Sequence, residues 1–280
     1  NSLTGLELEN QGGSGSVNSH WETRVMLGDY LISTSYGDSV LSDISLALFE
    51  DSGWYKVQYY TGGLFRYGKG EGCNFLNQKC VINGETLFPD EYCLSQGGPR
   101  CSTSRLFYGF CYLGNHNSNI DKEYQYFGSS TFGGFGPADY CPVAYDSTGT
   151  YRYTTSCIDG IESYSDVKEL GETIGKNSIC VLSTLRDNDY LEKLSTYTTT
   201  RAICHKMECD NSNKRTKFTI GNKTLTCPEN GGVIENPDGF TGKFECPIYN
   251  MVCTSDPYCS SISDGITSKS KAFDTKYDNY

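Results

Sequence analysis

The sequence predicts an α+β protein whose larger, later part is rich in disulfides, loops and strands. All fourteen cysteines lie between residues 73 and 259, whereas residues 1–72 contain none. Short strand-like runs lie between turn residues, and helical periodicity is confined to a few segments. A chain of 280 residues is long enough to bury a substantial core in one large domain or two ordinary ones.

The change in cysteine content near residues 67–72 predicts a domain boundary. We expect one domain at residues 1–72, a cysteine-rich domain at 73–262 and a polar tail at 263–280. The tail has few aliphatic residues, so we expect it to be mobile or a linker. It lacks the apolar end of a lipid-anchor signal. No apolar run in the sequence approaches the roughly 20 residues that span a bilayer.

In the first domain, residues 40–51 are predicted to form a helix. Ser39 is a suitable cap for its start, and Gly53 follows its end. A strand is expected at residues 56–60. The apolar side chains that recur at three- and four-residue steps, and so predict the buried face of the helix, are Leu41, Ile44, Leu48 and Phe49.

In the cysteine-rich domain, residues 217–220 have the composition of a strand. Helices are plausible at residues 166–174 and 187–196, although neither segment has strong apolar periodicity.

The cysteines are irregularly spaced and include no C-x-x-C pair, which favours disulfides over thiolate zinc sites or redox motifs. We therefore expect a protein of the secretory pathway, located outside the cell or at its surface. The glycosylation sequon at Asn222 agrees with this location. Asn1 does not begin a signal peptide. We expect either that upstream sequence was removed or, as we favour, that the sequence belongs to a longer protein.

The net charge of −11 and the pI near 4.8 make nucleic acid an improbable partner, because binding phosphate relies on clustered Lys and Arg.

A glycine-rich loop in residues 6–24 leads to His20. Gly12, Gly13 and Gly15 allow the backbone turns that could bring this histidine to a metal, and neutral imidazole is a good zinc ligand. A lone histidine beside Trp21 is more often a packed or surface residue, so the residues alone leave both interpretations open.

The segments 9–13 and 19–20, read together, resemble the stretch that carries the third zinc-binding histidine of leishmanolysin-type metalloproteases, which belong to the metzincin group. The resemblance continues through residues 48–55, 72–80, 101–105 and 139–143. It covers most of residues 6–253 and implies that residues 1–72 are the end of a metzincin-type catalytic domain. It also implies one zinc ion in the intact protein, with His20 as a ligand.

The H-E-x-x-H helix of that family supplies two further histidines and the glutamate that acts as general base. This motif does not occur here, so we expect it in an upstream part of the same protein. This chain alone should then be inactive, and no catalytic residue is assigned within it.

The family's spacing, counted from His20, places the methionine of the metzincin turn at Leu31. Leucine has a similar volume and could keep the apolar floor of the site. The segment after that turn would bring Thr34 and Ser35 near substrate. An ordinary connection at residues 32–37 is an equally good interpretation.

The resemblance also implies six disulfides. Cys73 would pair in that family with a cysteine upstream of the glycine-rich loop, and Cys259 has no assigned partner. The six implied pairs are Cys80 with Cys141, Cys93 with Cys111, Cys101 with Cys180, Cys157 with Cys204, Cys209 with Cys253, and Cys227 with Cys246.

Two functions follow from these observations. The first is the downstream part of an extracellular zinc metalloendopeptidase, which acts on proteins or peptides. The second is a catalytically inactive family member that serves as a structural or adhesive surface protein and binds other surface proteins. His116 is interpreted as a loop residue, and disulfide bonding of Cys204 and Cys209 argues against a metal site at His205.

Overall fold

The computed structural model describes residues 5–34, 39–57, 65–145, 156–158, 170–190 and 200–253. The chain divides into two compact units, residues 1–98 with 110–146 and residues 99–109 with 147–280. Each unit has its own hydrophobic core. The division follows spatial contacts, whereas the predicted boundary at residue 72 follows cysteine content and stays a prediction. The predicted tail lies outside the described residues.

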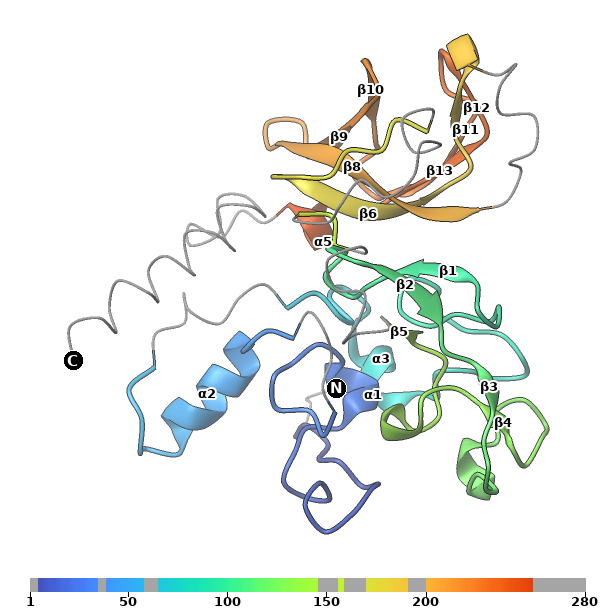
Figure 1. The fold of residues 1–280 in the computed structure, drawn as a ribbon. Helices are drawn as coiled ribbons and strands as arrows, with labels where there is room; N and C mark the ends of the chain where they lie inside the picture. The colour runs from blue at the N-terminus through green and yellow to red at the C-terminus, as the bar shows by residue number, and fades with distance from the viewer. Residues whose placement is uncertain are drawn as a thin grey trace. The chain divides into compact units, whose positions relative to one another are not determined.

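The first unit is built from short elements joined by long loops (Figure 1). The last residues of β2 (Tyr108–Cys111) pair with β5, and β3 pairs with β4. The other elements of this unit are α1 (Thr23–Met26), α2 (Asp43–Asp51), α3 (Cys73–Asn77), the 3-10 turns η2 (Lys122–Tyr124) and η3 (Gly136–Ala138), and the strands β3 (Gly114–Asn115), β4 (Phe132–Gly133) and β5 (Ala144–Tyr145).

Aromatic side chains form the centre of the first unit. The rings of Phe75 and Tyr92 stack with their centroids 5.7 Å apart, and Tyr67 meets Phe75 edge-on at 5.2 Å. The hydroxyls of Tyr67 and Tyr92 both donate to the backbone carbonyl of Arg24, each at 3.1 Å. The core therefore holds α1, which follows His20, by packing and by hydrogen bonds.

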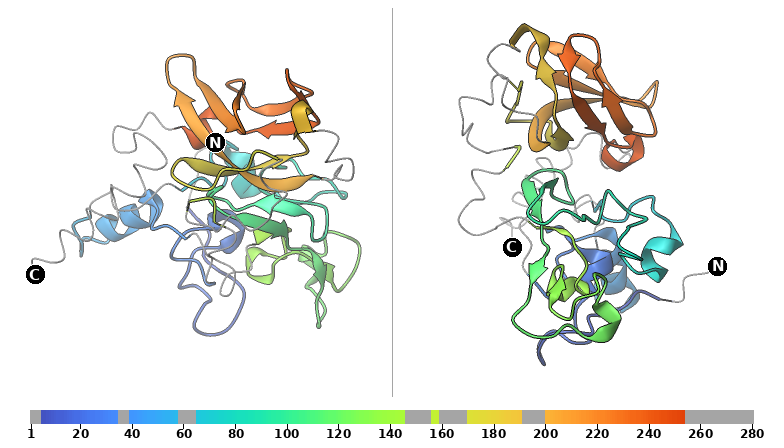
Figure 2. Two further views of the ribbon diagram at one scale, coloured as in Figure 1. Left: turned by 45° about the horizontal axis from the view of Figure 1, so that its top comes forward. Right: turned by 90° about the vertical axis from the view of Figure 1, so that its right-hand side faces the viewer.

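Helix α2 was predicted correctly as an element, but its start and its buried face were wrong. The helix begins at Asp43, and the cap is Ser42, whose hydroxyl accepts from the backbone N–H of Ser45. Ile44 and Leu48 are 45% and 46% exposed, and α2 projects from the part of the unit that holds α1 and α3 (Figures 1 and 2). The buried Ser45 faces inward instead.

The anchoring of Ser45 explains this orientation. Its hydroxyl donates to the buried Asp29 carboxylate at 2.8 Å and accepts from the indole N–H of Trp21 at 2.9 Å. A buried carboxylate needs such donors, so polar contacts rather than apolar periodicity select the face.

The second unit contains an antiparallel six-stranded sheet with strand order β10-β9-β8-β6-β13-β11, whose strands are labelled in Figure 1. The predicted strand at residues 217–220 is confirmed as part of β9. The strands of this sheet are β6 (Ser178–Ser183), β8 (Arg201–Asp210), β9 (Arg215–Ile220), β10 (Lys223–Thr226), β11 (Gly232–Glu235) and β13 (Lys243–Cys246). The remaining elements are β1 (Pro99–Cys101), β7 (Arg186–Asp187), η5 (Asn188–Tyr190), β12 (Phe240–Thr241) and α5 (Tyr249–Val252).

The core of this unit is formed by side chains from the sheet and from segments outside the sheet. Phe218 and Phe244 are fully buried, with ring centroids 5.0 Å apart. The opposed residues Cys180 on β6 and Cys204 on β8 each form a disulfide, to Cys101 and Cys157 respectively. Crosslinks therefore tie segments outside the sheet to its central strands.

The disulfides of the structure join the same six pairs that the resemblance implies. Cys73 is exposed and forms no disulfide within the described part of the chain. Cys259 lies outside the described residues.

Three weakly patterned elements did not form as predicted where the structure describes them. Residues 170–174 are not helical, and residues 187–190 are the end of β7 followed by η5; the rest of both predicted helices is outside the described ranges. Lys56 and Val57 are not in a strand, and residues 58–60 are likewise not described. Asp187 is held by pairing with Phe240 and by the Lys223 ammonium at 2.6 Å, which are tertiary contacts that override local propensity. Within the described ranges, no helix is both long and apolar enough to cross a membrane.

Candidate functional site

The glycine-rich loop is closed at its base by backbone hydrogen bonds between its two limbs. The N–H of Glu9 donates to the His20 carbonyl at 2.9 Å, and the N–H of Glu22 donates to the Glu7 carbonyl at 3.1 Å. Of the three predicted turn glycines, only Gly12 has a left-handed conformation, with φ of 91°. The loop thus presents His20 at the end of its second limb.

The His20 ring has a defined hydrogen-bonding arrangement. Its Nδ1 lies 3.2 Å from the Ser16 carbonyl oxygen and 3.1 Å from the Ser19 hydroxyl. Because a carbonyl oxygen only accepts, the tautomer with the proton on Nδ1 satisfies the contact to Ser16 and has the Nε2 lone pair available. Zinc-binding histidines generally donate their other ring N–H in this way, so the partly buried ring fits a zinc ligand.

Leu31 lies beside the residue that follows His20. Its carbonyl accepts from the Trp21 N–H at 3.0 Å, and its side chain packs against the same core as Trp21. The predicted floor position is therefore close to the His20 backbone, and the residue there is apolar. Thr34 is partly buried, and Ser35 is outside the described residues.

Two fully buried glutamates lie on the limbs that carry His20. The Glu9 carboxylate accepts from the Ser33 hydroxyl at 2.7 Å and from the Gln11 N–H at 2.9 Å, which links the loop to the segment after Leu31. Glu22 accepts from the Arg24 N–H at 2.9 Å. Burial, followed by repulsion from Asp139, raises the pKa of Glu22 to about 8.

Sequence reasoning did not assign roles to Glu9, Glu22, Arg24 or Asp139. A signal was present, since all four lie in stretches that carry the family resemblance, 6–24 and 139–143. Acidic and basic residues are usually exposed, however, and nothing in the local pattern indicates that these side chains are buried.

The described residues contain no group of three or more His, Cys, Asp or Glu side chains that could hold a metal ion. His205 is fully buried, and its Nδ1 lies 3.0 Å from the Gly171 carbonyl. Both neighbouring cysteines, Cys204 and Cys209, are in disulfides. The described residues therefore do not by themselves make up a complete metal site around His20.

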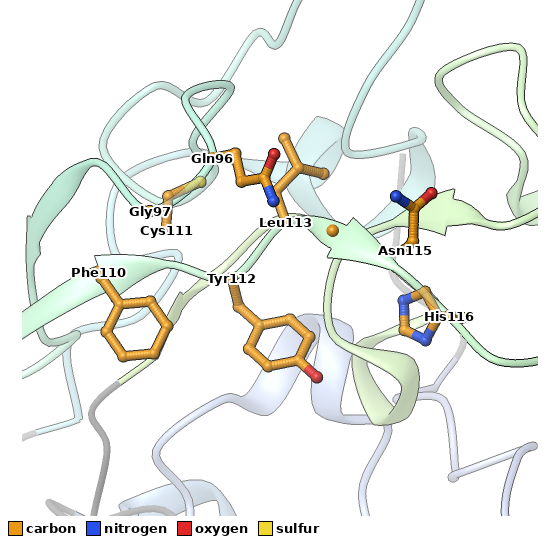
Figure 3. Close-up of a pocket in the computed structure, with 9 residues that line it drawn as sticks. Gln96, Gly97, Phe110, Cys111, Tyr112, Leu113, Asn115 and His116 are labelled. Atoms are coloured by element: carbon orange, nitrogen blue, oxygen red, sulfur yellow. The ribbon is translucent and has the colours of Figure 1, made fainter.

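A separate pocket of about 260 Å³ surrounds His116 in the first unit. Figure 3 shows the Gln96 and Asn115 amides, the Tyr112 ring and the His116 ring around it. The Nε2 of His116 lies 2.9 Å from the Gly134 carbonyl. Of the residues that line it, none is Asp, Glu, Lys or Arg, and His116 supplies an imidazole.

The family model described as leishmanolysin, peptidase family M8, matches residues 1–259. The chain is 30% identical over 265 residues to a leishmanolysin homolog of Crithidia fasciculata, covering 91% of the chain and 39% of that protein. It is 26% identical over 258 residues to leishmanolysin of Leishmania tropica, covering 89% of the chain and 38% of that protein.

A leishmanolysin-like peptidase of Drosophila melanogaster is 32% identical over 167 residues, covering 53% of the chain and 24% of that protein. The chain thus spans well under half the length of these relatives. The match of the family model to almost the whole chain shows that the chain belongs to the leishmanolysin family.

Proposed function

We propose that this chain is part of an extracellular or cell-surface zinc metalloendopeptidase, in which His20 supplies one of the zinc ligands. The orientation of the His20 ring carries the proposal. Its Nδ1 is engaged by the Ser16 carbonyl at 3.2 Å, which directs the basic lone pair of Nε2 away from the loop backbone. The other two ligands and the general base would come from an H-E-x-x-H helix elsewhere in the protein.

The residues of this chain would hold and shape the site. Bound zinc would polarise a peptide carbonyl and lower the pKa of a coordinated water toward about 7. His20 would hold the metal, and Leu31 would give the site an apolar floor next to the Trp21 backbone. Thr34 and Ser35 would lie toward the substrate.

The described crosslinks support a secretory route for this protein, because disulfides persist in oxidising compartments. Asn222 is exposed in the turn between β9 and β10, where a glycan would meet no core packing. Protein or peptide substrates are the proposed partners.

Zinc content and peptide cleavage of the intact protein test this function. We expect stoichiometric zinc and cleavage that a chelator abolishes, and we expect His20→Ala to lose both. His116→Ala is the matched control, since His116 lies in a pocket without other metal ligands, and this variant should keep both. An intact protein without zinc, or a His20→Ala variant that cleaves like the wild type, would overturn the proposal.

A catalytically inactive structural or adhesive protein is the second candidate. Leu31 favours it, because this position departs from the methionine that the family resemblance implies. Stoichiometric zinc together with chelator-sensitive cleavage would exclude this candidate.

A further inference from the structure

One carboxylate joins the two limbs of the loop that carries His20. Asp139 Oδ1 accepts from the Gln11 side-chain amide at 2.9 Å, and Asp139 Oδ2 accepts from Arg24 Nε at 3.2 Å. Gln11 precedes His20 in the loop, and Arg24 follows it in α1. The side chain of a residue more than a hundred positions away thus spans both sides of the proposed ligand.

The contact between Asp139 and Arg24 is sheltered from water. The two residues are 4% and 8% exposed, so their attraction is only weakly screened. The Nη2 of Arg24 donates to the Glu7 carboxylate at 3.0 Å and to the Leu76 carbonyl at 3.3 Å, and Nη1 donates to the Gln78 carbonyl at 3.5 Å. A buried ionic group whose donors are satisfied holds a single geometry.

Asp139 is itself attached to a rigid part of the first unit. It follows η3 in a left-handed conformation with φ of 54°. Its neighbour Ala138 is fully buried, and two residues later Cys141 is crosslinked to Cys80. The carboxylate therefore has little freedom to follow the loop if the loop moves.

From this geometry we infer that Asp139 is a positioning residue for His20, holding Gln11 and Arg24 so that the loop presents the imidazole in one place. The inference rests on the proposed function, since it assigns His20 to zinc. Asp139 acts through the loop backbone and touches neither metal nor substrate in this role. The contacts of Asp139 add to the hydrogen bonds that the loop makes within itself, and they come from a residue outside the loop.

The test compares Asp139→Asn with Asp187→Asn in the intact protein. The asparagine side chain can still accept a hydrogen bond from Gln11. It presents either an N–H or an uncharged oxygen to Arg24, so the ion pair between Asp139 and Arg24 is lost. Asp187 is the matched control, because it is 7% exposed and pairs with Lys223 at 2.6 Å in the other unit.

Two readouts separate positioning from general stability. We expect Asp139→Asn to weaken zinc affinity by about 10-fold, the lower end of outer-sphere effects, as measured by chelator competition. We also expect faster hydrogen–deuterium exchange in residues 10–20 of the zinc-free protein. Asp187→Asn should change neither. Gln11→Ala removes the other contact of Asp139, at a partly buried position. This variant should also weaken zinc affinity and speed loop exchange, and it serves as the test if Asp139→Asn does not fold.

A folded Asp139→Asn protein with wild-type zinc affinity and wild-type loop exchange would overturn the inference. A wild-type intact protein that holds no zinc would instead refute the proposed function and, with it, the ligand role of His20. Loop exchange in the zinc-free variants would still decide whether Asp139 orders the loop.

Discussion

At the scale of single residues, burial dominates the electrostatics around the His20 loop. Asp139 contacts the Arg24 guanidinium, which favours the charged carboxylate, yet desolvation is the larger effect and raises the pKa of Asp139. Glu22 lacks a partner for Oε2 among the described residues, and its pKa is raised further. Burial therefore costs free energy for the charged form of both groups.

His205 makes the stability of the second unit depend on pH. Burial lowers the pKa of its ring to about 4, from 6.5 when exposed. The unfolded chain therefore takes up a proton first, so the free energy of unfolding should fall as the pH drops from about 6.5 toward 4. The full effect is on the order of 3 kcal/mol, at about 1.36 kcal/mol per pKa unit.

Denaturant unfolding across this pH range measures the effect. His205→Gln should flatten the dependence, because the glutamine has no ring to protonate, whereas His116→Gln should retain it. An unchanged pH profile in His205→Gln would show that another group is responsible.

At the scale of elements, α2 shows which helical features are local. Its existence and its end shortly before Gly53 follow from the sequence pattern, and Gly53 adopts the left-handed conformation, with φ of 72°, that glycine favours after a helix. Its orientation depends on the hydrogen bonds that Ser45 makes with Asp29 and Trp21, which lie in an earlier segment of the chain. The segments without apolar periodicity, at 170–174 and 187–190, had no comparable local signal and take their structure from neighbouring parts of the chain.

The cap of α2 is open to direct measurement. Ser42→Ala removes the acceptor for the Ser45 N–H and should lower the free energy of unfolding by about 1 kcal/mol, as measured in denaturant. Ser42→Thr keeps a hydroxyl at the same place and should stay close to the wild type. Equal losses in both variants would indicate that close packing at this buried position, and not the cap, is what matters.

At the scale of the whole molecule, two cores are each stabilised by their own crosslinks. Cys80–Cys141 lies in the first unit and closes a separation of 61 residues, whereas Cys227–Cys246 lies in the second and closes 19. Such crosslinks restrict the unfolded chain and supplement the modest cores of a loop-rich protein.

Removing one disulfide should lower the stability of the unit that contains it. Cys80→Ala with Cys141→Ala is expected to lower stability by about 2–5 kcal/mol and to raise hydrogen exchange within residues 65–98 and 110–145. Cys227→Ala with Cys246→Ala should do so within residues 200–253. Increased exchange in both regions for either double variant would contradict independent stabilisation of the units.

The sequence by itself determined the family resemblance, the position of His20, the cysteine-rich composition and the strand at residues 217–220. These features reside in short motifs and in residue content, which need no knowledge of distant contacts. Only the tertiary structure decided which nitrogen of His20 lies against the Ser16 carbonyl, which face of α2 is buried, and that Asp139 contacts residues on both limbs of the loop. Each of these depends on a hydrogen-bond partner that folding brings near, such as the Asp139 carboxylate beside Arg24, 115 positions earlier in the chain.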